Sequence, residues 1–285
     1  MPPHRAGEPP DLVVVGHLTL DETPAGLRPG GSVLYAGLMA HHQGLRVGLL
    51  TSHGPDFPLE VLPAGIEVVA VPSPATTRFA LVYTREGRTL TLRARAAALA
   101  PIHLPPHFAE ADLAYLAPVA DEVTPDLAAA FPNAAVGVGA QGWCREWDQT
   151  GVVRMRPWPD PRPVLAHAQG LFLSSDDVLG WERQAVTLYQ HVPLGALTFA
   201  ARGAVLFVNG ERHPVAPVPA VEVDPTGAGD VFAAAFLIRY NATGDPWEAA
   251  SFAAVAGALT VEAPGIAGVP AAERLEARWR ELELR

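Results

Sequence analysis

The sequence predicts an α/β fold: a mainly parallel sheet covered by helices on both faces, as a three-layer α/β/α sandwich, with a small β-sheet attached. Short runs of apolar and β-branched residues alternate with apolar helical stretches along the 285 residues. This alternation is typical of strands buried in a parallel sheet. One pair of alternating, partly polar segments interrupts the rhythm, and such a pair favours an antiparallel hairpin outside the main sheet.

The strands of the main sheet are expected to be short and buried on both faces. The first, within Asp11–Gly16, contains four consecutive apolar residues and ends in glycine. Apolar runs of this length, bounded by turn residues, indicate core strands. The others are expected at Val47–Thr51, Ile66–Val71, Leu113–Leu116, Ala135–Val138, Leu171–Leu173, Leu194–Thr198 and Ala204–Val208.

The helices are predicted between these strands and in the C-terminal third. The first follows Gly30-Gly31, with Ser32 at or near its cap, because serine is favoured at that position. Gly244-Asp245-Pro246 separates two later helices, since glycine ends a helix and proline is tolerated in a first turn. The helices are expected at Val33–His42, Asp176–Tyr189, Val231–Tyr240, Glu248–Val261 and Ala271–Leu284.

The hairpin is predicted from two alternating segments around a glycine-containing turn. Thr76–Tyr83 and Thr89–Arg95 flank the turn Arg85–Arg88. One face of each arm is polar, so the hairpin is expected to expose one face to water. We therefore predict a separate small sheet that stands off the main one.

Composition excludes several classes of function. The formal net charge is −10 and the basic residues form no stripe, which argues against a nucleic-acid partner. All 20 basic residues are arginine, so a Walker A loop, a pyridoxal-phosphate Schiff base and a protein-kinase site lack their lysine. The single cysteine, Cys144, permits no internal disulfide and is expected to be structural.

The chain is expected to be cytoplasmic and to have no membrane partner. Met1–Pro10 is polar and proline-rich, without the apolar core of a signal peptide. The uncharged run Ala249–Val261 is too short to cross a bilayer.

The segment that carries chemistry is Asp224–Asp230, a glycine-rich turn that runs directly into the apolar helix after it. The first amides of such a helix lack intrahelical partners and lie at the positive end of its dipole. Gly227 and Gly229 let the backbone approach a ligand closely, so these amides can hold phosphate. Asp230 is either a helix cap or a base beside this phosphate site.

The order Asp-Pro-Thr-Gly-Ala-Gly-Asp resembles the C-terminal signature of the ribokinase-like (pfkB-type) carbohydrate kinases. A second match lies where that family has its N-terminal signature: Val13–Gly16, then Asp21, Gly30-Gly31 and a helix containing Ala36-Gly37. The resemblance extends from about residue 11 to residue 270.

The resemblance implies roles for the residues on the acceptor side. Asp230 would be the base that deprotonates the acceptor hydroxyl, and the amides of Gly227, Ala228 and Gly229 would form the anion hole. Asp21, Gly30 and Gly31 would bind hydroxyls of the acceptor. The chain, residues 1–285, would be one domain, with a lid made of residues 17–29 and 76–95 that closes over the acceptor. An exposed edge of such a lid can serve as a homodimer surface.

The resemblance also implies ATP as the phosphoryl donor, with Mg²⁺ and a monovalent cation as further ligands. Thr198, Gly203 and Thr226 match nucleotide-binding positions, although Ala200 stands where the family has glycine. Asp177 matches a position that organises Mg²⁺ through water, although Ser174 replaces an asparagine there. Asp224, next to Pro225, matches the monovalent-cation site.

On the acceptor side, Val33, Leu34 and Tyr35 occupy the neighbourhood where many members have an asparagine. Ala140-Gln141-Gly142-Trp143 with Arg145, and the run Gly-Gly-Ser-x-x-Tyr-Ala-Gly, are similar to a branch related to inositol kinases. Tyr35 and Trp143 either stack on a sugar or cyclitol face or are core residues.

The expected function is an ATP-dependent phosphotransferase that acts on a hydroxyl of a sugar, cyclitol or related polyol. Two alternatives stay open: a nucleoside kinase, and a catalytically silent ligand-binding protein on the same scaffold.

Overall fold

A nine-stranded sheet forms the centre of the computed structural model, which describes residues 7–23, 26–84 and 87–283. The strand order is β15-β14-β13-β12-β9-β8-β1-β4-β5. Neighbours from β13 to β5 pair in parallel, whereas the pairs β13–β14 and β14–β15 are antiparallel. The strands are β1 (Leu12–Val15), β4 (Val47–His53), β5 (Ile66–Pro72), β8 (Leu113–Leu116), β9 (Ala135–Gly139), β12 (Gly170–Ser174), β13 (Leu194–Thr198), β14 (Ala204–Val208) and β15 (Glu211–Val215).

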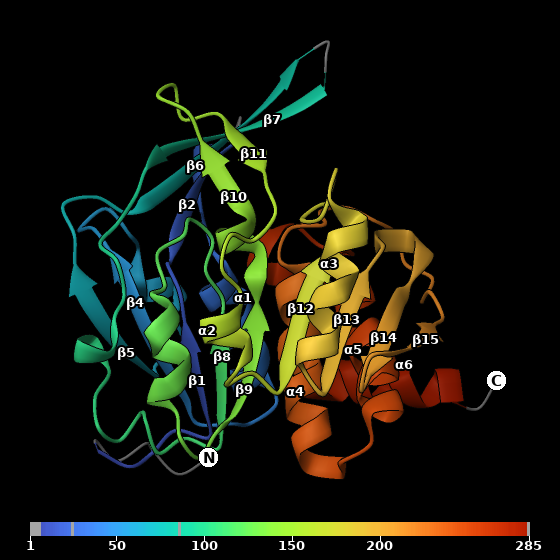
Figure 1. The fold of residues 1–285 in the computed structure, drawn as a ribbon. Helices are drawn as coiled ribbons and strands as arrows, with labels where there is room; N and C mark the ends of the chain where they lie inside the picture. The colour runs from blue at the N-terminus through green and yellow to red at the C-terminus, as the bar shows by residue number, and fades with distance from the viewer. Residues whose placement is uncertain (1–6, 24–25, 85–86, 284–285) are drawn as a thin grey trace.

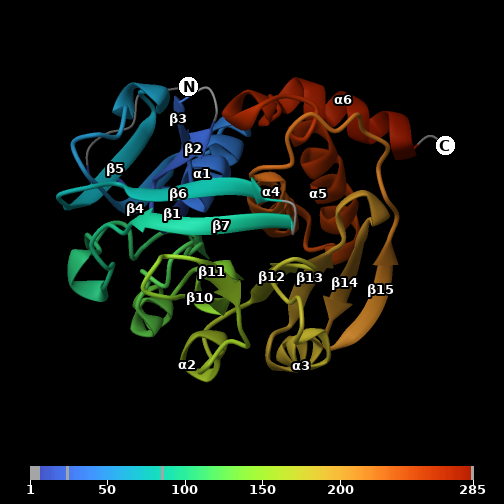
Figure 2. The same cartoon turned by 90° about the horizontal axis from the view of Figure 1, so that it is seen from above.

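Helices cover both faces of this sheet (Figures 1 and 2). Each face has its own cluster of buried apolar side chains. One cluster includes residues of α1 (Ser32–His42), α4 (Ala228–Thr243), α5 (Pro246–Thr260) and α6 (Ala272–Glu283). The other includes residues of α2 (Arg162–Leu165), α3 (Glu182–Leu188) and the 3₁₀ turn Pro125–Ala130. The predicted three-layer α/β fold is confirmed, because apolar strands of this kind need cover on both faces.

A second, four-stranded sheet stands off the main one (Figure 1). Its order is β3-β2-β6-β7, with β2 and β6 parallel and the outer pairs antiparallel. Of the ranges predicted for a lid, residues 24, 25, 85 and 86 lie outside the described part of the chain. The strands are β2 (Thr19–Thr23), β3 (Gly26–Gly30), β6 (Thr77–Thr84) and β7 (Gly87–Ala94).

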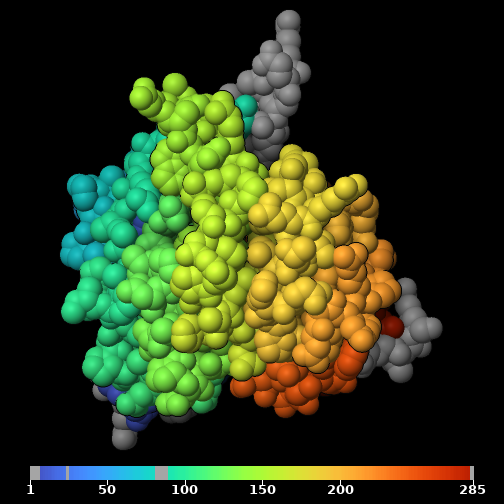
Figure 3. All heavy atoms as spheres, in the orientation of Figure 1, coloured from blue at the N-terminus to red at the C-terminus, as the bar shows by residue number. Residues whose placement is uncertain are grey.

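A short hairpin that we did not predict packs beside β7. It consists of β10 (Arg145–Trp147) and β11 (Val153–Met155). The backbone N–H of Leu92 donates to the carbonyl of Gly151 at 2.8 Å, which joins the hairpin to β7. In the space-filling view this yellow-green segment lies at the top of the face shown (Figure 3). The hairpin thereby links the chain after β9 to the small sheet.

The helix predicted over Asp176–Tyr189 begins only at Glu182. The carboxylate of Asp177 accepts hydrogen bonds from the N–H and the hydroxyl of Ser174, at 2.8 and 2.7 Å. These hydrogen bonds hold residues 174–177 in a turn, which competes with helix formation. Gly180 then has a positive φ of 87°, outside the helical region.

None of the helices in the described ranges is long and apolar enough to cross a membrane.

Candidate active site

The predicted site residues lie at or beyond the carboxyl ends of the parallel strands. β1 leads to β2, which carries Asp21, and β12 ends at Ser174, just before Asp177. β13 ends at Thr198, which pairs with Ser174 in the sheet. In open α/β sheets, ligands bind in the crevice outside this edge.

The glycine-rich loop forms the amino end of α4, as predicted. Gly227 is the residue before the helix and has a left-handed φ of 79°. A Cβ at Gly227 would collide with the ring of Tyr35, which is buried. Glycine therefore lets the loop pack directly on α1 in this conformation. The first-turn amides, including those of Ala228 and Gly229, are left without intrahelical acceptors.

Asp230 lies in the first turn of α4 and is partly exposed. Although part of the residue is exposed, desolvation of its carboxyl by the surrounding protein raises the pKa from 3.8 to about 7. A hydrogen bond from the side chain of Ser32 lowers the pKa, the charge of Asp177 raises it, and the charge of Arg145 lowers it. Ser32 is the first helical residue of α1 and has no capping bond. Ser32 is thus near the cap of α1, as predicted, and its hydroxyl donates a hydrogen bond to Asp230.

Asp21 lies next to the Gly30-Gly31 pair, and the resemblance assigns all three residues to acceptor binding. A Cβ at Gly30 would lie 2.7 Å from Oδ2 of Asp21. Gly31 has a φ of 100°, and a Cβ there would collide with the carbonyl of His17. Burial raises the pKa of Asp21 to about 6, against the opposing charges of Arg28 and Arg145 and a hydrogen bond from Thr19.

Asp224 begins the loop and has both oxygens engaged. Its Oδ1 accepts from the N–H of Thr226 at 3.0 Å. Its Oδ2 accepts from Nη1 of Arg28 at 2.6 Å and from the N–H of Gly265 at 2.9 Å. Burial acts to raise the pKa of Asp224, but the hydrogen bonds from Thr226 and Gly265 and the charge of Arg28 hold it below its ordinary value.

Asp177 is nearly buried and held from two sides. In addition to the two bonds from Ser174, its Oδ1 accepts from Nε2 of Gln141 at 3.0 Å. Because both carboxylate oxygens already have donors, Asp177 fits a role in which it acts on Mg²⁺ through water better than direct ligation. In the described ranges, no group of three or more His, Cys, Asp or Glu side chains could hold a metal ion.

Arg145 is close enough to the acidic residues of the site to feel their charge, although the sequence motifs assign it no role of its own. Burial lowers its pKa, while the charges of Asp177, Glu122, Asp230 and Asp21 raise it. Its Nη1 donates to the carbonyl of Val119 at 2.8 Å, and its guanidinium lies over the ring of Phe79. Nε of Arg145 is buried without a hydrogen-bond partner. The spacing of Gln141 and Arg145 was the sequence signal that could have identified both.

The positions predicted for nucleotide binding follow the ends of β12 and β13. The N–H of Ser175 donates to the carbonyl of Thr198 at 2.8 Å. Ala200 has a positive φ of 50°, which explains why glycine suits this position. Gly203 directly precedes β14, and its carbonyl accepts from the N–H of Phe199. Thr226 lies in the loop before α4, beside Asp224.

Tyr35 and Trp143 are core residues, which decides the alternative left open by the sequence. Trp143 is 3% exposed and stacks on Trp158 with ring centroids 4.8 Å apart. Its Nε1 donates to the carbonyl of Val123. The ring of Tyr35 packs on Gly227, so neither ring is free to stack on a substrate. The hydroxyl of Tyr35 is buried without a hydrogen-bond partner.

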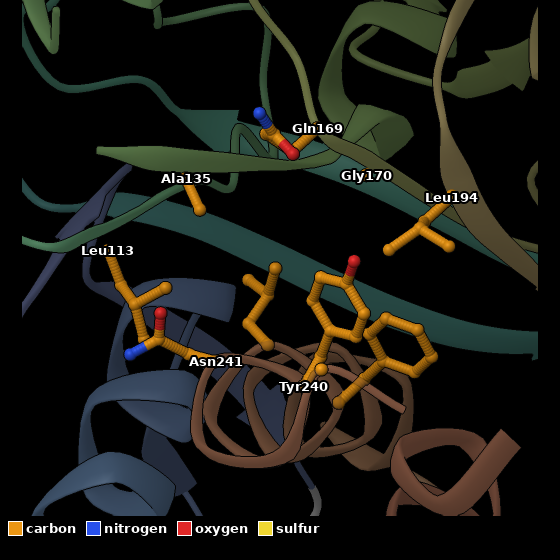
Figure 4. Close-up of a pocket in the computed structure, with 10 residues that line it drawn as sticks. Leu113, Ala135, Gln169, Gly170, Leu194, Tyr240 and Asn241 are labelled. Atoms are coloured by element: carbon orange, nitrogen blue, oxygen red, sulfur yellow. The ribbon is translucent and has the colours of Figure 1, made fainter. Parts of the chain in front are cut away.

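A cavity of about 200 Å³ lies away from these residues. Leu113, Ala135 and Leu194 line it on the sheet, and Tyr240 and Asn241 line it on α4 (Figure 4). Tyr240 is ten residues after Asp230 on the same helix, which corresponds to about 15 Å along its axis. This cavity therefore does not belong to the site at the amino end of α4.

Comparison with known proteins agrees with this geometry. Residues 184–272, which include the loop and Asp230, match the model of the pfkB family carbohydrate kinases. The part of the chain that contains the loop and Asp230 therefore resembles this family. The resemblance inferred from the two signatures is thereby confirmed.

Similar proteins and solved structures support kinase activity at the level of the ribokinase family. A cytidine kinase of Thermococcus kodakarensis is 27% identical over 255 residues, which cover 81% of this chain and 88% of that protein. A pyrophosphate-dependent kinase of the ribokinase family, solved with a pyrophosphate analog and myo-inositol, has a TM-score of 0.78 at 20% identity, covering 94% of this chain and 99% of that one. Ribokinase of Thermotoga maritima has a TM-score of 0.73 at 19% identity, with the same coverage. The last two likenesses show the fold.

Proposed function

We propose that this kinase transfers the terminal phosphoryl group of ATP to a hydroxyl of a sugar, cyclitol or related polyol, with Asp230 as the base. The observation that carries the proposal is the position of Asp230 in the first turn of α4, directly after the amides of Gly227, Ala228 and Gly229. Phosphoryl transfer requires a base for the acceptor and donors for the transferred oxygens at one place.

The electrostatics of Asp230 suit this role. A base works best when its pKa is near the working pH, because it is then both ionised and able to take the proton. Burial brings the pKa of Asp230 to about 7. The ionised carboxylate accepts the proton of the acceptor hydroxyl, while the loop amides stabilise the charge on the phosphoryl oxygens.

The acceptor is bound by side chains that suit several hydroxyl groups. Asp21 accepts hydrogen bonds, and Arg145 offers donors between Asp21 and Asp230. Gln141 donates to Asp177, whose charge acts on Arg145. We name myo-inositol as the first acceptor to test, because the site is polar and a myo-inositol complex exists for a protein of the same fold.

Thr198, Gly203 and Thr226 are proposed to bind the donor, and the residues present fit Mg²⁺ held by the donor phosphates and water. Asp177 would orient that water, and the ion would neutralise charge on the donor phosphates. The small sheet β3-β2-β6-β7 is proposed as a lid that closes over the acceptor and excludes water.

A nucleoside kinase is the second candidate, and the cytidine kinase relative favours it. A nucleobase would gain from stacking on an exposed aromatic ring. Tyr35 and Trp143 are both occupied in the core, which favours the polyol.

The test is product formation from an acceptor panel of pentoses, hexoses, inositols and nucleosides, supplied with Mg²⁺ and either ATP or pyrophosphate. Product identified by ³¹P NMR with a polyol acceptor supports the proposal, and the Asp230→Asn variant should form none at comparable enzyme concentration. Product with nucleosides alone would support the second candidate. Donor binding by a folded protein that phosphorylates no acceptor would favour the silent binding protein.

A further inference from the structure

The carboxylate of Asp224 lies at the start of the loop whose amides would hold phosphate, and its charge has to be balanced. An unbalanced carboxylate beside an anion-binding loop would repel the phosphate. Only 13% of the Asp224 side chain is exposed, so water screens this charge weakly. A positive charge at Asp224 is therefore a requirement of the proposed function.

Arg28 supplies a positive charge at this place. Its Nη1 lies 2.6 Å from Oδ2 of Asp224, and the two residues are 196 positions apart in the sequence. Arg28 is on β3 of the small sheet, so the ion pair connects this sheet to the loop. Charge-assisted hydrogen bonds of this length are among the stronger ones in proteins.

Neighbouring residues pack closely against the side chain of Arg28. The N–H of Gly265 donates to the same oxygen of Asp224, and Gly265 has a φ of 54°. A Cβ added at Gly265 would lie 3.3 Å from Cδ of Arg28. Nε of Arg28 is buried and has no hydrogen-bond partner. Arg28 is also directly opposite Asp21 in the register of β2 and β3. The charge of Arg28 thus acts on both Asp21 and Asp224.

The ion pair also fixes the geometry of the loop. Asp224 accepts from the N–H of Thr226 through its other oxygen, and the N–H of Ala228 donates to the carbonyl of Pro225 at 3.3 Å. A rotation of the Asp224 carboxylate would release Thr226 and with it the turn that leads to Gly227. Holding Asp224 therefore holds the amides of the proposed anion hole.

We propose that Arg28 is a positioning residue for the anion hole, and that its guanidinium supplies at Asp224 the charge for which the sequence suggested a monovalent cation. This inference rests on the proposed function. It implies that phosphate binding does not require added K⁺ or Na⁺.

The experiment measures the binding of inorganic pyrophosphate by calorimetry, in KCl and in tetramethylammonium chloride at equal ionic strength. The variants are Arg28→Met, which keeps length without charge, and Arg28→Lys, which restores a charge. Arg46→Met is the matched control, because Arg46 also pairs with an aspartate, Asp11 at 2.5 Å, but at the start of β1. Thermal melts accompany each titration.

Wild type and Arg46→Met should bind pyrophosphate equally in both salts. Arg28→Met should bind about 10- to 100-fold more weakly in tetramethylammonium, the loss expected for a charge-assisted bond. K⁺ should restore part of this affinity to Arg28→Met, because the ion can then approach Asp224, and Arg28→Lys should be intermediate.

The proposal is overturned if K⁺ strengthens the binding of pyrophosphate to the wild type 10-fold or more, which corresponds to about 1.4 kcal/mol of binding free energy. This result does not depend on any variant. The proposal is also overturned if Arg28→Met binds as tightly as Arg46→Met. Because binding is measured without an acceptor, these outcomes are independent of whether the wild type phosphorylates any member of the panel.

Discussion

Asp224 and Asp230 enclose the same short loop, yet their surroundings push their pKa values in opposite directions. Asp224 has hydrogen-bond donors at both oxygens and a guanidinium against it, which keep its pKa below the ordinary value. Asp230 is desolvated and has Asp177 nearby, and its pKa rises to about 7. Carboxylates whose environments differ in this way commonly have different roles in an active site. In the proposed function the first carboxylate anchors the loop and the second is the base.

The largest expected effect comes from removing the base. Asp230→Asn should lower kcat by about 10²–10⁴, the range for a lost general base, and should leave the KM for the donor nearly unchanged. Steady-state kinetics on an active acceptor measure both. A variant with full turnover would assign Asp230 to the helix cap alone.

A smaller loss is expected when the anchor is neutralised. Asp224→Asn keeps the shape of the side chain but loses the charge that pairs with Arg28, so kcat/KM should fall about 10- to 100-fold. Unlike Asp230→Asn, this variant should weaken donor binding, because the loop loses its support. Donor Kd values for the two variants separate the roles, and equal donor affinities would contradict the comparison.

Arg145 should tune the base. Its charge lowers the pKa of Asp230, so Arg145→Met should move the acid limb of the kcat/KM profile to higher pH than in the wild type. It should also raise the acceptor KM, by about 10-fold if one charged hydrogen bond is lost. Arg239→Met is the control, because Arg239 also lies over aromatic rings but is on the carboxyl-terminal half of α4, away from Asp230. An unmoved profile in Arg145→Met would remove Arg145 from this account.

The smallest effect concerns stability, and it should have opposite signs at the two carboxylates. The pKa of Asp230 is higher in the folded than in the unfolded state, so its ionisation lowers the free energy of unfolding as the pH rises from about 4 towards 7. Asp230→Asn should therefore raise Tm at pH 8 by about 2–6 °C and have less effect at pH 5. The lowered pKa of Asp224 stabilises the fold above its unfolded value, so Asp224→Asn should lower Tm at pH 8. Scanning calorimetry at both pH values checks the signs, and a matching sign would contradict the comparison.

The main sheet and the loop could be predicted because their signals are local. Apolar runs such as Val47–Thr51 mark buried strands, and the glycines of Asp224–Asp230 mark a turn at the amino end of a helix. Helix α3 was predicted to begin six residues too early, because the apolar pattern could not show that the carboxylate of Asp177 accepts hydrogen bonds from Ser174.

The ion pair between Arg28 and Asp224 could not be predicted, since it joins segments that only the folded chain brings together. The same is true of the hydrogen bond from the hydroxyl of Ser32 to Asp230. Short-range patterns specify elements, whereas the charges around a carboxylate depend on tertiary packing.

The most direct measurement is the pH dependence of kcat/KM for the wild type on an active acceptor, from pH 5 to pH 9. We predict that the rate rises with pH and levels off above an apparent pKa near 7, because Asp230 must be ionised to accept the proton. The limb should be absent from the residual activity of Asp230→Asn. A profile that is flat across this range in the wild type, or a limb that persists unchanged in Asp230→Asn, would contradict the assignment of Asp230 as the base.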